Sequence, residues 1–324
     1  MSLTVDDLQA RAAVLHEALP WIQRFAGSTM VVKLGGAAMG APEGSGEPQG
    51  GVRGTPRGVP GASGGAPVAP VLDAFVDDLV LLRSVGVDVV VVHGGGPEIS
   101  QAMARMGKQP VFVDGHRVTD ADTIDLVRMV LVGRVNKALV GRINTRGRLA
   151  VGLSGEDGLL VVARPRVDPA GRDLGFVGDV DAVDPTALRA LTDRGLLPVV
   201  ATVAAGPGGQ PYNVNADAVA GALAAALGAE KLVYLTDVAG LYADVDDPGS
   251  LLRRLDLPAV EALLAEGRCS AGMVPKLGGL VAALRAGVGS AHIIDGRLAH
   301  ALLLELLTDS GVGTMVRREP EAGA

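Results

Sequence analysis

The chain has 324 residues, 48% of them apolar but 2% aromatic, so Val, Leu and Ala must fill its core. Its net charge of −7 argues against a nucleic-acid partner, because no basic surface would contact the phosphate backbone. A single cysteine, Cys269, excludes an internal disulfide and fits a reducing compartment. Because there is neither a signal-like leader nor an apolar run near the ~20 residues that span a bilayer, we expect a cytoplasmic protein without membrane contact.

The first predicted element is a helix over residues 4–26, with Thr4 and Asp7 at capping spacing. Its apolar positions recur at helical spacing and form one stripe: Leu8, Ala12, Leu15 and Leu19. Pro20 is expected to kink or break this helix. Trp21 and Phe25 follow it, and the pattern leaves open whether they pack on this chain's own core or on another subunit.

Residues 29–34 predict the first strand, which ends in Lys33-Leu34-Gly35-Gly36. A buried lysine charge is costly without a partner, so one interpretation is a cation aimed at a phosphate. The alternative is a lysine that snorkels from the end of the sheet. Residues 41–70 follow, and because half of these thirty positions are Gly or Pro, they predict a flexible surface insertion.

The next strand, 88–93, contains four consecutive valines and stops at Gly94-Gly95-Gly96-Pro97. Such a run fits a strand buried on both faces, as in a parallel sheet. Glycines allow a tight turn with close approach to a ligand, and Pro97 suits the first turn of a helix. Strand, turn and helix N-terminus together predict an anion site, usually for phosphate, although a plain tight βα turn would look similar.

Arg117 lies in the loop Gly115-His116-Arg117-Val118-Thr119-Asp120, just before a helix that runs to about residue 143. An arginine in this place can bind a carboxylate bidentately, and the alternative is a surface salt bridge. Thr119 or Asp120 is expected to cap the helix.

Polar residues also cluster in the second half of the chain. Asn213, Asn215 and Asp217 alternate, so in extended form they share a face, although a helix cap would use the same residue types. Lys276 lies near a predicted helix start, where a lysine opposes the helix dipole, and this indicates an anionic ligand. Thr236 and Asp237 follow strand 231–235 at the sheet edge where α/β proteins bind ligands.

The alternation of strands and helices predicts an α/β protein: a three-layer αβα sandwich around a mainly parallel open sheet. Hairpin-like strands are expected at 159–163 and 174–180, and a last strand at 312–316. Neither a Walker-A motif nor a dinucleotide-binding glycine fingerprint is present, so two common phosphate-binding folds are unsupported.

Five segments together resemble the acetylglutamate kinase branch of the amino acid kinase family. They are Lys33–Gly36, His93–Pro97, Gly115–Asp120, Asn213–Asp217 and Gly272-Met273-Val274-Pro275-Lys276. The resemblance implies the amino acid kinase fold and phosphoryl transfer from ATP, with Mg²⁺ on the nucleotide, to the side-chain carboxylate of N-acetyl-L-glutamate. Lys33 and Lys276 would stabilise the transferring group and the leaving side, and Asp217 would orient both lysines.

The resemblance also implies binding residues. The acceptor would be bound by Gly95, Gly96, Arg117, Asn213 and Asn215. The ATP phosphates and nucleotide would be bound by Gly35, Gly36, Thr236, Asp237, Gly272 and Met273. Residues 28–205 would form an acceptor-binding lobe and 206–324 an ATP-binding lobe.

In the arginine-inhibited branch an extra N-terminal helix links dimers into a hexamer, and residues 1–27 resemble it. The residues that would bind arginine are Trp21, His292, Gly296, Glu305 and Gly313. Two alternatives stay open at this point: a kinase for a related acyl amino acid such as aminoadipate, and a non-catalytic subunit that binds arginine or nucleotide.

Overall fold

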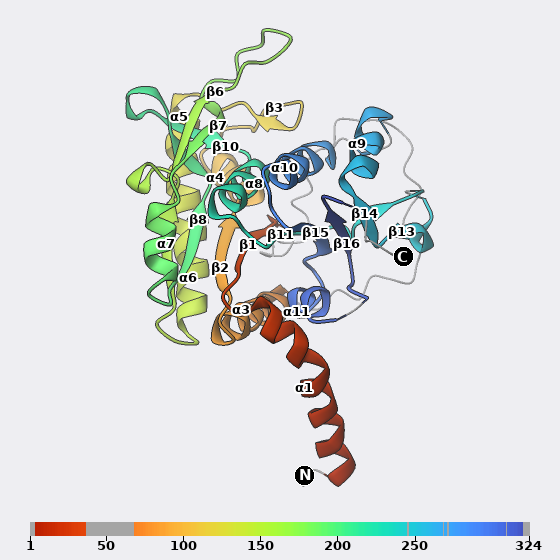
Figure 1. The fold of residues 1–324 in the computed structure, drawn as a ribbon. Helices are drawn as coiled ribbons and strands as arrows, with labels where there is room; N and C mark the ends of the chain where they lie inside the picture. The colour runs from red at the N-terminus through yellow and green to blue at the C-terminus, as the bar shows by residue number, and fades with distance from the viewer. Residues whose placement is uncertain are drawn as a thin grey trace.

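The computed structural model describes residues 4–36, 68–244, 246–267, 269–270, 272–308 and 310–319. One eight-stranded sheet crosses the molecule in the order β14-β16-β15-β11-β1-β2-β8-β5 (Figure 1). Its strands are β1 Thr29–Leu34, β2 Asp88–His93, β5 Ala150–Ser154, β8 Leu197–Ala201, β11 Lys231–Thr236, β14 Arg254–Asp256, β15 Ser290–Asp295 and β16 Thr314–Arg317. All neighbours in it pair in parallel except β15 and β16, so the predicted α/β class with a mainly parallel sheet is confirmed.

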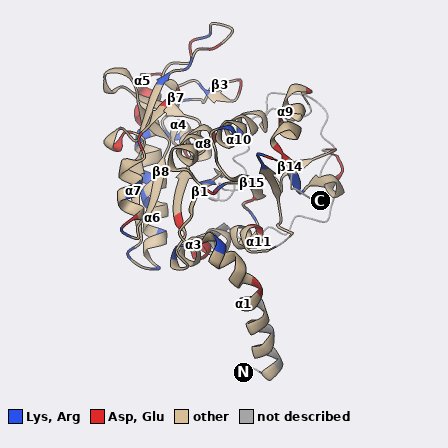
Figure 2. Cartoon of the chain, viewed as in Figure 1, with Lys and Arg blue, Asp and Glu red and all other residues tan. Residues whose placement is uncertain are grey.

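Helices cover both faces of this sheet, and α1 projects away from it (Figure 1). In chain order, the helices of the described residues are α1 Val5–Phe25, α3 Val68–Ser84, α4 Gly96–Arg105, α5 Ala121–Arg128, η1 Met129–Asn136, α6 Lys137–Asn144, α7 Thr186–Thr192, α8 Ala216–Leu227, α9 Leu257–Ala265, α10 Val274–Arg285 and α11 Ala301–Leu306, with short turns η2 Asp157–Leu159, η3 Pro207–Gly209 and η4 Pro248–Ser250. Alternate residues of β2 enter two cores: Val90 and Val92 pack with α8 and α10, and Val89 and Val91 with α3 and α11. Because both faces are covered, β2 is apolar and uncharged along nearly its whole length (Figure 2).

Smaller sheets lie beside the main one. The hairpin β3 Phe112–Val113 with β4 His116–Arg117 and the pair β12 Leu241–Tyr242 with β13 Leu251–Leu252 are two-stranded. A closed barrel is formed by β6 Val161–Pro165, β7 Val177–Val183, β9 Val203–Ala205 and β10 Pro211–Val214. β10 follows the predicted lobe boundary at 205/206, but in this barrel it pairs with strands that precede the boundary. The division into two lobes stays a prediction.

The sheet order decides where the site lies. β1 lies between β2, the next main-sheet strand along the chain, and β11, which comes from the second half of the chain. The strand order therefore reverses at β1. In open α/β sheets, ligands bind at the carboxyl ends of strands at such a switch point. Lys33, near the end of β1, is therefore placed at the edge where a ligand is expected.

Three expectations about elements need correction. α1 runs through Pro20 without a break; it projects away from the body (Figure 1), where solvent can hydrate the carbonyl that the proline leaves without a donor. The strand predicted at 312–316, which was expected to complete the sheet at its edge, is β16, but β14 lies outside it and forms that edge. Most of the predicted insertion 41–70 lies outside the described residues, and its last three residues, 68–70, begin α3.

The exposed part of α1 carries the predicted apolar stripe. Leu8, Leu15 and Leu19 are exposed, whereas Phe25, at the end of the helix, is buried in the core under α3. Trp21 stacks on Phe25 with ring centroids 6.0 Å apart. Within the described residues no helix is both long enough and apolar enough to cross a membrane.

Candidate active site

Two lysines that are far apart in sequence meet at one carboxylate. Lys33 Nζ lies 2.8 Å from Oδ1 of Asp217, and Lys276 Nζ lies 3.6 Å from Oδ2. Lys33 is 8% exposed and Asp217 is 4% exposed. Lys33 therefore does not snorkel to solvent; it is a buried cation with a partner. The arrangement presents two positive charges, steadied by one negative charge, at the edge of the sheet.

Local structure explains the position of Asp217. The side chain of Asn215 is the N-cap of α8, accepting hydrogen bonds from the backbone N–H groups of Asp217 (2.8 Å) and Ala218 (3.1 Å). Asp217 thus lies in the first turn, and Tyr234 donates a hydrogen bond to its carbonyl at 2.9 Å. The cap interpretation of this cluster is therefore correct for Asn215, and Asp217 is free to face the lysines.

Close packing of two helices brings Lys276 to Asp217. A Cβ added at Gly221 of α8 would lie 2.7 Å from the carbonyl oxygen of Gly279 in α10, so these helices touch backbone to backbone. Lys276 lies in the first turn of α10, where its ammonium group reaches the first turn of α8. The approach requires the small residue, and a larger side chain at Gly221 would separate the two charges.

The electrostatics keep Asp217 ionised. Burial would raise the pKa of its carboxyl group, but the Lys33 and Lys276 ammonium groups outweigh burial and hold the pKa below its usual value. The three side chains therefore keep a net positive charge near neutral pH. Such a centre can stabilise an anion that carries more negative charge than a single carboxylate.

This centre opens into a cavity of about 320 Å³. Its walls include many residues expected from the sequence: Lys33, Gly35, Gly36, Gly95, Gly96, Arg117, Asn213, Asn215, Asp217 and Lys276. A Cβ added at Gly95 would lie 2.6 Å from Leu131 Cδ2, so a larger residue here would require the Leu131 side chain to move. The helix start at Pro97 is as predicted. The two lysines, the glycine loop and a third cation, Arg117, thus line the same cavity.

Arg117 is buried, at 6% exposed, so the surface salt-bridge alternative is wrong. Its Nη2 donates to the Gly96 carbonyl (2.9 Å) and to Ser100 Oγ (2.8 Å), and its guanidinium lies over the Phe112 ring at 4.7 Å. Asn213 donates to Thr119 Oγ1 at 3.3 Å. The guanidinium is thus held in one orientation in the cavity wall, which suits recognition of a carboxylate.

Some predicted residues lie elsewhere. Thr236, Asp237, Gly272 and Met273 do not line this cavity in the described part of the chain. Thr236 ends β11 beside β1, so it shares the edge of the sheet, and its hydroxyl donates to Asp237 at 2.9 Å. The Gly35 N–H donates to the Leu235 carbonyl at 3.0 Å, so it is not available to a phosphoryl oxygen as the sequence led us to expect.

A sequence profile of the amino acid kinase family matches residues 28–295. The chain belongs to the amino acid kinase family. Relatives in this family resemble it over nearly its full length. An acetylglutamate kinase of Symbiobacterium thermophilum is 50% identical over 311 residues, covering 94% of this chain and 97% of the relative. A chloroplastic acetylglutamate kinase of Arabidopsis thaliana is 48% identical over 306 residues, covering 94% and 80%.

Solved structures of the family share the fold. An N-acetylglutamate synthase from Neisseria gonorrhoeae, complexed with coenzyme A and N-acetyl-glutamate, gives a TM-score of 0.77 at 26% identity. The match covers 95% of this chain and 64% of that longer chain. A carbamate kinase from Giardia lamblia bound to AMP-PNP gives a TM-score of 0.61 at 17% identity, covering 91% of this chain and 99% of that one, and shows the likeness of fold alone.

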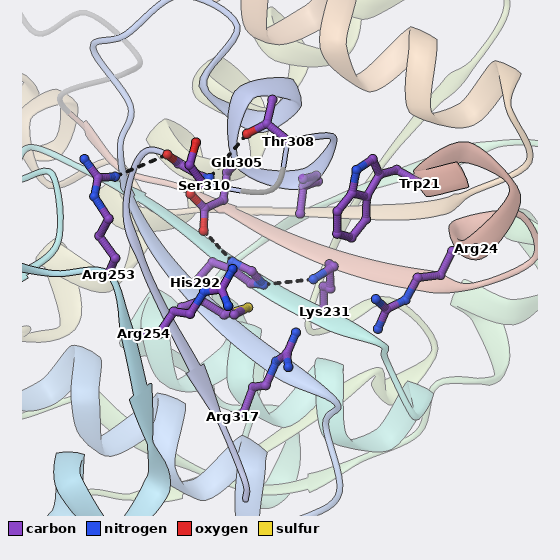
Figure 3. A pocket seen from close by; sticks show the side chains of 13 residues that line it. Trp21, Arg24, Lys231, Arg253, Arg254, His292, Glu305, Thr308, Ser310 and Arg317 are labelled. Carbon is purple, nitrogen blue, oxygen red and sulfur yellow. Dashed lines mark hydrogen bonds and ion pairs between the residues drawn. The ribbon is translucent and has the colours of Figure 1, made fainter. Parts of the chain in front are cut away.

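A second cavity lies between the end of α1 and residues 231–317 in the C-terminal part of the chain (Figure 3). Trp21 and Arg24 of α1 line it together with Lys231, His292 and Glu305. His292 Nδ1 lies 2.7 Å from Glu305 Oε1, and His292 Nε2 lies 3.1 Å from Lys231 Nζ. Burial lowers the pKa of His292 to about 4 and that of Lys231 to about 8. His292 is thus neutral at pH 7, and it links the Glu305 carboxylate to the Lys231 ammonium group, which stays mostly protonated at this pH.

The residues predicted for arginine divide into two places. Trp21, His292 and Glu305 line this second cavity, and the Gly313 N–H donates to Glu305 at 2.9 Å. Gly296 does not join them: it follows the carboxyl end of β15, and its N–H donates to the Thr236 carbonyl at 2.8 Å.

Arg24 and Lys231 are among the lining residues that sequence reasoning missed. A signal was available for each. Arg24 follows Trp21 by almost one helical turn, so both can face the same way. Lys231 opens a predicted buried strand, where an unpartnered lysine charge is costly.

Proposed function

We propose that this protein transfers the γ-phosphoryl group of ATP to the side-chain carboxylate of N-acetyl-L-glutamate, giving N-acetyl-L-glutamyl 5-phosphate in arginine biosynthesis. The observation that carries the proposal is the pair of lysines held on Asp217, 2.8 Å and 3.6 Å away. Support for this acceptor comes from acetylglutamate kinases at 48–50% identity over 94% of the chain. A non-catalytic subunit would not need two cations that converge on one buried carboxylate.

In the proposed reaction a carboxylate oxygen of the acceptor attacks the γ-phosphorus, and the bond to the β–γ bridging oxygen breaks to release ADP. The attacking carboxylate is already ionised near pH 7, so no general base is required. Catalysis then depends on positioning and on charge stabilisation. Lys33 would stabilise the transferring group between donor and acceptor, Lys276 the leaving side, and Asp217 would hold both ammonium groups in place.

The backbone contributes further donors. The N–H groups of Gly36 and Gly95 are proposed to face phosphoryl oxygens as charge spreads over them. Gly35 contributes by its size instead, because a Cβ there would lie 2.6 Å from the Leu235 carbonyl oxygen. We place the nucleotide beside the ends of β11 and α10, where Thr236, Asp237, Gly272 and Met273 lie. Residues 28–205 would then serve the acceptor and 206–324 the nucleotide.

Mg²⁺ fits this site as a partner of the nucleotide. Among the described residues that line the cavity, Asp217 is the acidic one, and both its oxygens already face lysines. We therefore propose that the ion is bound by ATP phosphate oxygens and water, the ligands that Mg²⁺ usually keeps in kinases. When bound, it would neutralise phosphate charge.

Arg117 and Asn213 are proposed to bind the α-carboxylate of the acceptor, with Gly95, Gly96 and Asn215 alongside. Replacing Arg117 by lysine should raise the KM for acetylglutamate by about 10- to 100-fold, because lysine keeps the charge but loses the planar guanidinium that Gly96 and Ser100 hold in one orientation. The KM for ATP should change less than about threefold. Steady-state kinetics with each substrate varied in turn measures both effects. An equal rise in both KM values would contradict this role.

The proposed function is tested by an ATP-dependent hydroxamate assay, in which hydroxylamine traps the acyl phosphate. Acetylglutamate should give product, and free glutamate, aspartate and N-acetyl-aminoadipate should give at most a few per cent of that rate. A faster rate with the aminoadipate compound would favour the related kinase. No product with any acceptor, from protein that binds ATP, would favour the regulatory subunit.

We further propose that arginine inhibits the enzyme by binding in the second cavity, and that α1 links dimers into a hexamer. The exposed leucines of α1 support the linking role. The arginine site is supported by Trp21 and Arg24, which place the end of α1 in the wall of the second cavity. In that cavity the carboxylate of arginine would be bound by Lys231 and its neighbours.

Deleting residues 1–25 is expected to give dimers that arginine inhibits at least tenfold less well, because the deletion removes both the linking helix and one wall of the cavity. Light scattering and hydroxamate assays with increasing arginine measure this. Full-length protein is the control. Intact hexamers after the deletion would argue against the linking role, and unchanged inhibition would argue against this cavity.

A further inference from the structure

The glycine loop 94–96 is held from behind by two side chains. His93 Nδ1 lies 2.8 Å from the Gly94 carbonyl oxygen, and Arg117 Nη2 donates to the Gly96 carbonyl at 2.9 Å. Both carbonyls are therefore tied away from the reacting groups. This leaves Gly95, between them, as the part of the loop that faces the acceptor.

The chemistry of its neighbours fixes the tautomer of His93. A carbonyl oxygen can only accept a hydrogen bond, so Nδ1 must carry the proton and Nε2 must be an acceptor. The amide nitrogen of Asn136 lies 3.1 Å from Nε2 and donates to it. His93 is fully buried, and burial lowers its pKa to about 4, so the ring stays neutral near pH 7.

Asn136 is itself firmly held. Its side-chain nitrogen also donates to the Val199 carbonyl at 2.9 Å, and the residue is fully buried. A Cβ added at Gly152 would lie 2.0 Å from Asn136 Oδ1, so the neighbouring strand β5 makes room for this amide only because it has a glycine there. The position is thus built around the asparagine side chain.

Asn136 ends the π-helical segment η1, which also forms the wall behind Gly95. Leu131 Cδ2 and Val135 Cγ2 would lie 2.6 Å and 3.4 Å from a Cβ at Gly95. π-Helical turns displace side chains relative to a regular α-helix and occur often at functional sites. Here the same segment contacts the loop directly and also through His93.

We propose that Asn136 is a positioning residue for phosphoryl transfer: through the neutral ring of His93 it fixes the glycine loop so that the Gly95 N–H is aimed at the acceptor site. Neither side chain touches a reacting atom. Losing the link lets the loop shift, and a displacement of about 1 Å can cost about 100-fold in rate. The inference rests on the proposed function for its kinetic consequence, but the state of the loop can be measured independently.

The test compares Asn136→Ala, His93→Asn and the double variant with wild type. His93→Asn keeps a donor near Nδ1 but removes the ring that Asn136 contacts. Each single variant should lower kcat about 10- to 100-fold, with the KM for ATP changed less than about threefold. The double variant should lose no more than the worse single one, because both changes break the same link.

Hydrogen exchange gives the readout that does not need activity. Amides in the peptide 93–103 should exchange about tenfold faster in each variant, whereas amides of β11 should keep their rate. Asn144→Ala is the matched control, because Asn144 also bridges helix and strand, donating to the Ala150 carbonyl at 3.1 Å, but away from the loop. It should leave kcat and loop exchange unchanged.

Three results would overturn the inference: loop exchange equal to wild type in both variants, kcat effects that multiply in the double variant, or the same losses in Asn144→Ala. If Asn136→Ala does not fold, His93→Asn and the exchange measurement decide alone. A wild-type protein that fails to phosphorylate acetylglutamate would count against the proposed function, and the exchange result would still stand or fall separately.

Discussion

Replacing Lys33 by alanine is expected to lower kcat about 1,000-fold while the folded structure persists. The lysine is buried against Asp217, at 2.8 Å, at the point where charge develops on the transferring group. Loss of a preorganised donor of this kind costs about 100- to 1,000-fold in rate. Asp217 keeps its partner Lys276 at 3.6 Å, so the buried carboxylate is not left alone. Hydroxamate assays at saturating substrates measure kcat, and thermal unfolding measures stability.

Asp217→Asn should also lower kcat by about 100-fold or more, because an amide cannot hold two ammonium groups against their mutual repulsion. A matched control is Lys108→Ala, which removes another lysine that is paired with a carboxylate, Asp120, but on an exposed surface. That variant should keep kcat within about twofold. Normal turnover in purified Lys33→Ala or Asp217→Asn protein would remove the basis of the assigned roles.

The free energy of unfolding is expected to fall by at least about 3 kcal/mol as the pH drops from 6.5 to 4. Burial lowers the pKa values of His93 and His292 from 6.5 to about 4. In this pH range the unfolded chain therefore binds two protons that the folded protein does not bind. Each histidine costs the folded state about 1.4 kcal/mol per pH unit. Asp78 acts the other way: burial raises the pKa of its carboxyl to about 6, so the folded protein takes up one proton first.

These three groups give a slope of about one proton, or about 1.4 kcal/mol per pH unit between pH 6 and pH 4. His116, Glu305 and Asp217 also have lowered pKa values, so they make the fall steeper. Urea unfolding at several pH values measures it. His93→Asn should remove one titrating group and lower the slope by about 1.4 kcal/mol per pH unit between pH 6 and pH 4. Wild-type protein measured in parallel is the control. A slope that stays the same in His93→Asn would show that this ring does not titrate as stated.

Local chemistry explains why much of the fold could be predicted. The valine run of β2, the glycines after it and Pro97 constrain the backbone within a few residues, and the strand, turn and helix are as expected. Asp120 caps α5 through the Thr123 N–H at 2.9 Å, also as expected. In contrast, the break that Pro20 could have caused does not occur, because α1 continues through it.

The site was predicted less evenly, and the reason is distance along the chain. Lys33 and Lys276 could be singled out because each is locally unfavourable, as a charge in a buried strand and as a cation at a helix start. Asn136 and Lys231 carried no local motif that was recognised. Their roles come from contacts with His93 and His292, on strands 43 and 61 positions away.

The sequence by itself determined the strands, the glycine turns and the kinds of charge placed at the ends of strands, because these follow from short-range sterics and solvation. The tertiary structure decided which of those charges meet. Asp217 reaches both lysines because β1 lies at the centre of the sheet, and because the glycines of α8 and α10 let two helix backbones touch. It likewise separated Gly296 from Glu305, which the family resemblance had grouped: Glu305 lines the second cavity, whereas the Gly296 N–H donates to the Thr236 carbonyl. Convergence of distant groups depends on strand order and helix packing, which no single segment encodes.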